Sequence, residues 1–232
     1  PVATNAGSYA VYYYIPADST YDELAGNIHV MIGQIDLSAF NVTNLNATYV
    51  YTGGGVEPQP KITDTTRNYI LIKDTDYELS YNANINVTDI AQVTIAGKGN
   101  YKGTINRLFS IIQKAVDTPT NLTWNAGVAS WSNVENESGY NITLYKNYVA
   151  QSTTYTTATD VNSYDFTDVL KGEVNNWYFT VYARGVGNFK DSALSTQSAL
   201  QYSMLVSFEA NSGTVCSGEM HIRGDVLTLP TT

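Results

Sequence analysis

The sequence predicts an all-β protein, made of several β-sandwich modules in a row and ending in an incomplete β segment. Short runs of β-branched and aromatic residues alternate with polar residues, and they recur roughly every 8 to 12 residues between clusters of Gly, Asn, Asp and Pro. A helical period is almost absent. With 232 residues and 43% hydrophobic side chains, the chain can bury more than one core.

The clearest of these runs have the length of sandwich strands. They cover residues 8–15, 27–32, 77–81, 92–96, 108–112, 140–145 and 177–183.

The composition excludes several classes of partner and site. Lys and Arg number 12 against 21 Asp and Glu, and the formal charge of −9 does not suit nucleic acid or an anionic membrane. No run approaches the roughly 18 apolar residues that cross a bilayer. The single Cys forms no internal disulfide and no cysteine-type zinc site. We therefore expect neutral partners, no nucleic acid, no membrane insertion and no cofactor.

An internal repeat indicates that the chain begins inside a module. Two segments share a polar turn, a tyrosine roughly 15 residues later and then an apolar alternation. The first has Asn5-Ala6-Gly7, Tyr21, Val30 and Ile32, and the second has Asn86-Val87-Thr88, Tyr101, Phe109 and Ile111. Only the second is preceded by more of its own module. We expect residues 1–36 to be the C-terminal part of one module and residues 37–114 to be the next.

The segment 37–114 carries several short motifs. Tyr51-Thr52-Gly53 is the first, the run DYELSYNAN at 76–84 is the second, and GKGNYKG at 97–103 is the third. The glycines around Asn100 predict tight turns with positive φ, and Tyr101 is placed to lie across one end of a sandwich. These motifs resemble the signatures of the bacterial immunoglobulin-like modules of the MBG or YTG type, which occur in tandem in large surface proteins.

The segment 115–203 follows a different pattern after Pro119. Leu122 and Trp124 suit a first strand, 129–131 a second and 139–144 a third, while 192–195 lead into the last. Residues 177, 179, 181 and 183 alternate as the inward face of the sixth strand. This pattern resembles a fibronectin type III module. Trp177 stands where that family commonly has a tyrosine, so an indole N–H is the group available to replace its hydroxyl.

The last segment, 204–232, has VSFEANSGTV at 206–215 and TLP at 228–230. It resembles the opening of an internalin-type B repeat, also called the Listeria–Bacteroides repeat. Because only the front portion is present, we expect an incomplete β tail.

No set of residues has the spacing of a catalytic or metal site. His29 lies in an alternating strand and His221 in the tail, which favours structural or surface roles. Asp74, Asp76 and Glu78 at i, i+2 and i+4 would share one face of a strand and offer oxygens to Ca²⁺, or simply form a polar strand entry. A second acidic group, Asp160, Asp165 and Asp168, lacks the EF-hand spacing. We predict a chain that is not an enzyme, with no catalytic, cofactor-binding or metal-binding residues.

Aromatic side chains are the best candidates for binding, since sugars stack on Tyr and Trp and protein partners use them as anchors. The run Tyr12-Tyr13-Tyr14 places rings on both faces of its strand. Tyr178 and Tyr182 should point outward if Phe179 and Val181 point inward. The alternative is that these rings only cover the sheet, and the sequence does not identify a ligand.

Taken with the family resemblances, these features predict a non-catalytic segment of a modular bacterial cell-surface protein that acts as a stalk or adhesion module. Host or cell-wall glycans and extracellular proteins are the expected partners, and the segment itself should be monomeric and extracellular, on the cell surface or secreted. The alternative is a spacer or carbohydrate-binding accessory region of a secreted glycan-degrading enzyme.

Overall fold

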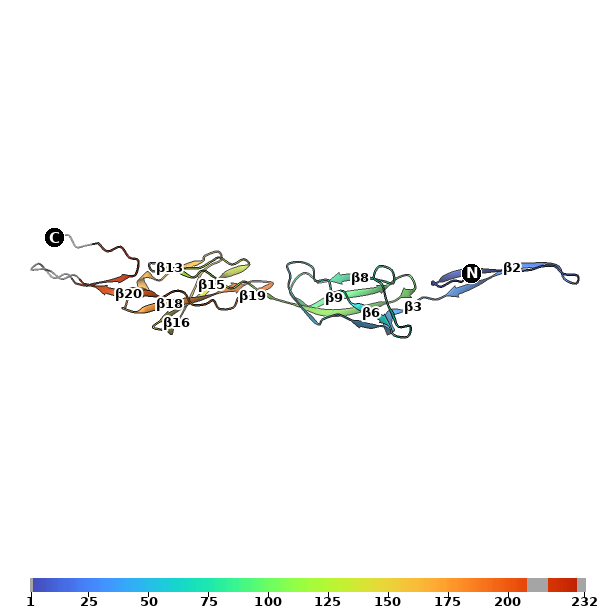
Figure 1. Cartoon of the computed structure of the whole chain (residues 1–232), viewed down its shortest axis with the longest axis horizontal. Coiled ribbons are helices and arrows are strands. Elements are labelled where there is room, and N and C mark those ends of the chain that lie inside the picture. The colour runs from blue at the N-terminus through green and yellow to red at the C-terminus, as the bar shows by residue number, and fades with distance from the viewer. Residues whose placement is uncertain (1, 208–216, 229–232) are drawn as a thin grey trace, which may run out of the picture. The chain divides into compact units, whose positions relative to one another are not determined.

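The computed structural model describes residues 2–207 and 217–228 (Figure 1), and almost all of their regular structure is β. The chain divides into two compact units, Pro1–Ile112 and Gln113–Thr232. Both units contain packed β-sheets, so the predicted all-β fold of β-sandwiches in series is confirmed. The finer division into modules 1–36, 37–114, 115–203 and 204–232 stays a prediction.

The first unit opens with a regular two-stranded hairpin, β1 (Gly7–Ile15) and β2 (Leu24–Ile32). Gly7 pairs with Ile32 and Ile15 with Leu24, without a register shift. Directly opposite residues share a face. One face is therefore almost wholly apolar, and the other carries Tyr12, Tyr14, Asn27 and His29. The apolar face consists of Tyr9, Val11, Tyr13, Ile15, Leu24, Ile28, Val30 and Ile32.

The rest of the first unit is a sandwich. A three-stranded sheet, β4-β6-β7, faces a four-stranded sheet, β5-β11-β9-β8, in which β5 runs parallel to β11. A short parallel pair joins β3 to β10, and the 3-10 helix Leu37–Ala39 follows β3. The strands are β3 (Ile35–Asp36), β4 (Asn41–Thr43), β5 (Thr48–Val50), β6 (Lys61–Asp64), β7 (Tyr69–Ile70), β8 (Tyr77–Asn82), β9 (Thr88–Gly97), β10 (Tyr101–Lys102) and β11 (Thr104–Ile112).

The core of this sandwich forms two clusters along the sheets. One gathers around Leu37, Ile62 and Ile95, and the other around Val93 and Phe109. Tyr101 closes one end as predicted: its side chain is 5% exposed and meets the Phe40 ring edge-on at 5.7 Å between centroids.

The positions near Tyr101 require glycine for two different structural reasons. Gly99 and Gly103 have φ values of 62° and 82°, which L side chains rarely adopt. Gly97 does not have a positive φ, contrary to expectation. A Cβ there would instead lie 2.7 Å from the backbone nitrogen of Lys102, so the close approach of β10 selects glycine.

The second unit packs a three-stranded sheet, β13-β14-β17, against a five-stranded sheet, β16-β15-β18-β20-β21. The short β12 runs parallel to β19. The elements are β12 (Lys114–Ala115), β13 (Thr123–Asn125), β14 (Val128–Ser130), β15 (Glu137–Lys146), β16 (Val149–Thr156), β17 (Ser163–Asp165), α1 (Thr167–Leu170), β18 (Asn176–Gly185), β19 (Phe189–Lys190), β20 (Gln201–Val206) and β21 (Glu219–Ile222).

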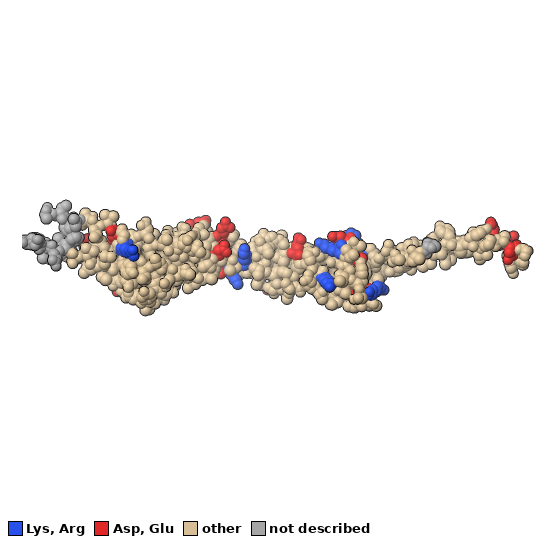
Figure 2. Space-filling model, viewed as in Figure 1, with Lys and Arg blue, Asp and Glu red and all other residues tan. Residues whose placement is uncertain are grey.

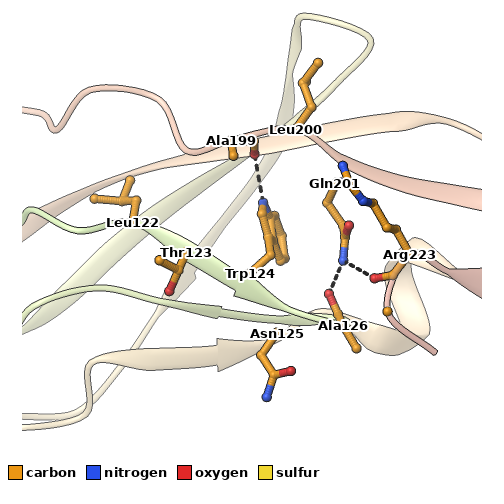
Figure 3. A pocket seen from close by; sticks show the side chains of 10 residues that line it. Leu122, Thr123, Trp124, Asn125, Ala126, Ala199, Leu200, Gln201 and Arg223 are labelled. Carbon is orange, nitrogen blue, oxygen red and sulfur yellow. Dashed lines mark hydrogen bonds between the residues drawn. The ribbon is translucent and has the colours of Figure 1, made fainter. Parts of the chain in front are cut away.

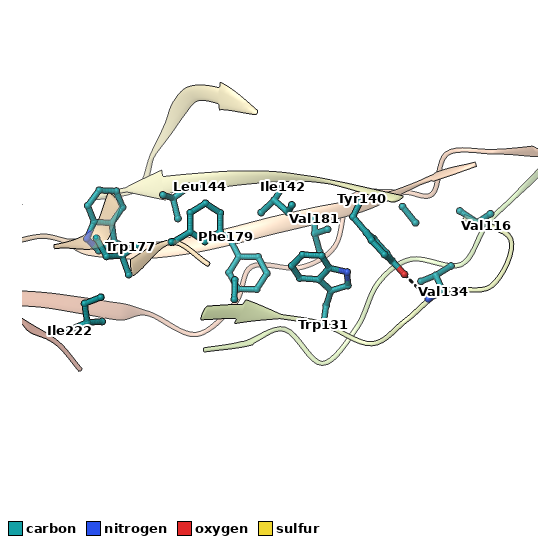
Figure 4. Packing of buried hydrophobic residues seen from close by; sticks show 14 residues of the cluster. Val116, Trp131, Val134, Tyr140, Ile142, Leu144, Trp177, Phe179, Val181 and Ile222 are labelled. Carbon is teal, nitrogen blue, oxygen red and sulfur yellow. Dashed lines mark hydrogen bonds between the residues drawn. The ribbon is translucent and has the colours of Figure 1, made fainter. Parts of the chain in front are cut away.

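The core of the second unit is built on β15 and β18 (Figure 4). All four predicted inward residues of β18, from Trp177 to Ala183, are at most 3% exposed. The Trp177 indole N–H donates to the Ser203 hydroxyl at 3.0 Å, so it does have a buried partner. Tyr140 is fully buried, and its hydroxyl accepts from the Val134 N–H at 2.7 Å.

A ladder of serines replaces a regular strand beside β18. The hydroxyl oxygens of Ser192, Ser195 and Ser198 accept from the backbone N–H groups of Ala183, Val181 and Phe179, at 2.9, 2.9 and 3.0 Å. The backbone N–H of each serine donates to the carbonyl of the same β18 residue. The segment thus advances three residues for every two of β18, and we call residues 192–198 the serine ladder.

The tail joins the second unit through β20 and β21. β20 crosses the boundary expected at residues 203 and 204, and it pairs with both β18 and β21. Ile222 is 2% exposed and belongs to the core of this unit. Residues 208–216, which hold most of the predicted B-repeat motif, lie outside the described residues.

Candidate functional site

The acidic residues of the first unit do not share a strand face. β8 begins only at Tyr77, so Asp74 and Asp76 lie in the turn before it. The Asp76 carboxylate is buried and accepts from the Tyr69 hydroxyl at 3.0 Å and the Ile72 N–H at 2.9 Å. Glu78 pairs with Lys98 on the neighbouring segment. The predicted alignment of three carboxylates was therefore wrong, because the strand entry is a turn with its own hydrogen bonds.

The acidic residues of the second unit also have structural partners. Asp165 accepts from the Thr167 N–H at 2.8 Å at the start of α1, and the hydrogen bonds from Thr167 lower the pKa of this carboxyl. Asp160 accepts from the Asn133 side-chain amide at 3.3 Å. Asp168 lies inside α1. Across residues 2–207 and 217–228, no three His, Cys, Asp or Glu side chains gather to hold a metal ion.

The two histidines belong to different units of the fold. His29 is exposed on the polar face of the hairpin, opposite Ala10. His221 is mostly buried in β21, with its Nδ1 3.6 Å from the Asp225 carboxylate. Asp225 also accepts from the Ile222 N–H at 3.0 Å and pairs with Lys171 at 3.1 Å. The hydrogen bond from Ile222, together with the lysine, lowers the pKa of the Asp225 carboxyl.

A stack of tyrosines covers the outer face of β15 and β18. Tyr145 and Tyr178 are paired across the strands, and their rings stack at 4.5 Å with an interplanar angle of 8°. Tyr148, in the turn after β15, leans on Tyr178 at 5.9 Å and is 65% exposed. Tyr178 points outward as predicted but is only 8% exposed, and this burial raises its pKa.

The tyrosine stack therefore presents Tyr145 and Tyr148, two residues that were not among the predicted binding aromatics. The sequence could have indicated these two tyrosines, since both flank the polar pair Lys146-Asn147 at the tip of the β15–β16 hairpin. Tyr182 lies farther along the same face, where its hydroxyl accepts from the Asn141 amide. On the hairpin of the first unit, Tyr12 and Tyr14 are 76% and 62% exposed.

A hollow of roughly 480 Å³ lies beside Trp124 in the second unit (Figure 3). The indole N–H donates to the Ala199 carbonyl at 3.1 Å, and the ring meets Phe179 edge-on at 5.0 Å. The Gln201 side-chain amide donates to the carbonyls of Ala126 and Arg223 and thereby ties three segments together. The guanidinium of Arg223 lies 5.9 Å from the centre of the Tyr202 ring.

Charge is sparse over the surface (Figure 2). On the face shown, most atoms belong to uncharged residues, and acidic and basic side chains form small groups. Ion pairs such as Arg67 with Asp64, Lys98 with Glu78 and Lys146 with Glu173 join neighbouring strands or turns. Uncharged residues therefore make up most of the face shown.

No helix among the described residues has the length and apolar character needed to cross a bilayer.

No family model and no curated protein matches this chain. Among solved structures, the FN1–FN3 domains of chicken CNTN1 are similar over 82% of this chain and 75% of that one, at 14% identity and a TM-score of 0.27. Domains A168–A170 from titin are similar over 84% of this chain and 74% of that one, at 11% identity and a TM-score of 0.25.

Proposed function

We propose that this chain is a non-catalytic segment of a modular bacterial cell-surface protein, in which β-sandwich modules in series act as spacers and interaction modules. The observation that carries the proposal is the presence of two compact units, each with its own buried core. Independent cores allow modules to be added along a chain without disturbing one another. The bacterial origin and the surface location rest on the motifs at 51–53, 76–84 and 97–103.

Partners in this role would be host or cell-wall glycans or extracellular proteins, and the tyrosine stack is the surface best suited to them. Aromatic rings offer a large contact area together with a polar hydroxyl. Tyr148 is exposed and is held by its contact with Tyr178. A ring that is already ordered loses little conformational entropy on binding.

Antibodies raised against this chain test the location. They should label intact cells of the source organism before permeabilisation, and brief protease treatment of the cells should remove the signal. Labelling that appears only after permeabilisation would overturn the proposal.

Replacement of Tyr148 by Ala tests the binding surface. In a glycan array and in a binding assay with extracellular matrix proteins, a ligand of the wild-type chain should bind Tyr148→Ala at least about 5-fold more weakly, the factor that corresponds to roughly 1 kcal/mol. Val149 is equally exposed at 65% in the same hairpin, so Val149→Ala is the matched control. Equal binding by the two variants would exclude the tyrosine stack as the contact.

The hollow beside Trp124 favours the second candidate, an accessory carbohydrate-binding region of a secreted glycan-degrading enzyme. A concave site that combines an aromatic ring with backbone carbonyls, an amide and a guanidinium suits a sugar. Titration with soluble oligosaccharides should shift the amide resonances of residues 122–126 and 199–201. Arg223→Ala should weaken that response, whereas Arg107→Ala in the first unit should not; no shift with any oligosaccharide would remove this candidate.

A further inference from the structure

The segment that enters the first sandwich is tied to a turn of that same sandwich by a glutamine. The side-chain amide of Gln34 donates to the carbonyls of Gly99 and Tyr101, at 3.0 and 3.2 Å. The next N–H, from Ile35, donates to the Asn100 carbonyl at 2.9 Å. One side chain thus spans the turn, and β3 follows in parallel to β10.

The second unit repeats this arrangement. The side-chain amide of Gln113 donates to the carbonyls of Gly187 and Phe189, at 2.9 and 3.2 Å. The N–H of Lys114 donates to the Asn188 carbonyl at 3.2 Å, and β12 follows in parallel to β19. Each of these hydrogen bonds therefore has its counterpart in the first unit.

The two turns also share their sequence. Gly99-Asn100-Tyr101-Lys102 matches Gly187-Asn188-Phe189-Lys190 as Gly, Asn, aromatic residue and Lys. The two glycines have nearly the same φ, 62° and 61°. The aromatic residues pack in equivalent ways, since Tyr101 belongs to the core of the first sandwich and Phe189 packs against the core of the second.

In the first unit, the side chain of Asn100 holds the start of the hairpin that precedes the sandwich. Its Oδ1 accepts from the Ala6 N–H at 2.7 Å, and its amide nitrogen donates to the side-chain oxygen of Asn5 at 3.1 Å. A hollow of roughly 340 Å³ lies at this junction, lined by both ends of the hairpin together with Gln34 and Gly99. Asn100 therefore contacts two segments at once: its carbonyl binds the linker and its side chain binds the hairpin.

We propose that the turn Gly99-Asn100-Tyr101-Lys102 is a docking site for the Asn-led start of the hairpin that precedes the first sandwich, and that each unit carries the same connector of one turn and one glutamine. The glutamine fixes the linker on the module that follows it. The Asn100 side chain binds one backbone N–H and one side-chain amide oxygen at the start of the preceding hairpin. Ala6 supplies the N–H and Asn5 supplies the oxygen. This inference goes beyond the proposed function, because these contacts hold a linker and a hairpin on a sandwich wherever the protein is located.

Amide hydrogen exchange on the ¹⁵N-labelled full chain tests the docking site. Asn100→Ala removes both side-chain contacts and should speed exchange at Ala6 by about 2- to 12-fold, the factor that corresponds to the usual net value of one hydrogen bond. Residual dipolar couplings should at the same time show that residues 7–32 have lost their fixed alignment relative to residues 41–112. Gln34→Ala should speed exchange at Ile35.

Two further variants keep the test decisive. Asn5→Ala leaves the turn intact, so it should weaken the alignment of the hairpin even if Asn100→Ala disturbs the sandwich. Asn106→Ala, an exposed amide on β11 of the same unit, should leave both readouts unchanged. The proposal is overturned if Asn5→Ala and Asn100→Ala both keep the wild-type alignment. These readouts do not depend on cell location, so their failure would leave the surface role untouched.

Discussion

Replacement of Ser195 by Ala tests the serine ladder. The Ser195 hydroxyl is the acceptor for the Val181 N–H at 2.9 Å, and the Val181 side chain is fully buried. Alanine keeps the backbone of the ladder but leaves this N–H without its acceptor, and Ser195 is only 7% exposed, which leaves little room for water. A buried donor without a partner costs about 1–3 kcal/mol.

The assay can follow the second unit alone. The chain has three tryptophans, Trp124, Trp131 and Trp177, and all of them belong to the second unit. Urea unfolding monitored by tryptophan fluorescence therefore reports on that unit within the full chain. With a slope of about 2 kcal/mol per M, the midpoint should fall by about 0.5–1.5 M.

A matched serine gives the comparison. Ser152 is exposed on β16, so Ser152→Ala should change the stability by no more than about 0.5 kcal/mol. Exchange of the Val181 amide should also become faster in Ser195→Ala only. If the two variants unfold at the same midpoint, then the hydroxyl does not serve as the acceptor and the ladder is held by backbone contacts alone.

Three further predictions concern packing, pH and metals. Gly139 has a φ of 117°, and a Cβ there would lie 2.2 Å from the Thr157 carbonyl, so Gly139→Ala should cost more than about 2 kcal/mol by urea unfolding; a loss below about 0.5 kcal/mol would contradict this. Asp165 and Asp225 have lower pKa values in the folded chain than in the unfolded chain, where the pKa is about 3.9. Both carboxylates therefore stabilise the fold when the pH is above that unfolded pKa, and this contribution is lost as the pH falls. The fluorescence-detected midpoint should therefore drop as the pH falls from about 5 to below that unfolded value, and a constant midpoint would refute the assignment. Excess chelator should leave both unfolding transitions in place, because Asp76 and Glu78 are engaged with protein groups; a fall of many degrees in the melting temperature would point to a bound cation.

The alternation of apolar and polar residues was sufficient to predict the long strands. All seven predicted runs lie in strands, and the inward face of β18 was identified residue by residue. Burial of one sheet face imposes a period of two, which is visible in a single sequence. Strand ends were less well placed, as at Asp76, because a turn with buried hydrogen bonds and a polar strand entry have the same composition.

The parts that the sequence did not reveal depend on contacts between distant residues. Gln34 and Gln113 look like ordinary surface glutamines, and only the fold brings each of them onto a turn more than 60 positions away. Ile222 likewise enters the core of the second unit from a segment that resembled a separate repeat. Tyr145 and Tyr148 could have been recognised from their place at a hairpin tip.

The serine ladder also affects what the sheet can do at its margin. A regular last strand offers a straight row of carbonyl and N–H groups to any strand that arrives from another molecule. Here the hydroxyls of Ser192, Ser195 and Ser198 donate to the carbonyls of Ala193, Thr196 and Ala199, and so occupy acceptors within the segment itself. Its spacing of three residues also matches no ordinary strand. The serine ladder would therefore make it harder for the sheets of neighbouring copies of this protein to join into aggregates.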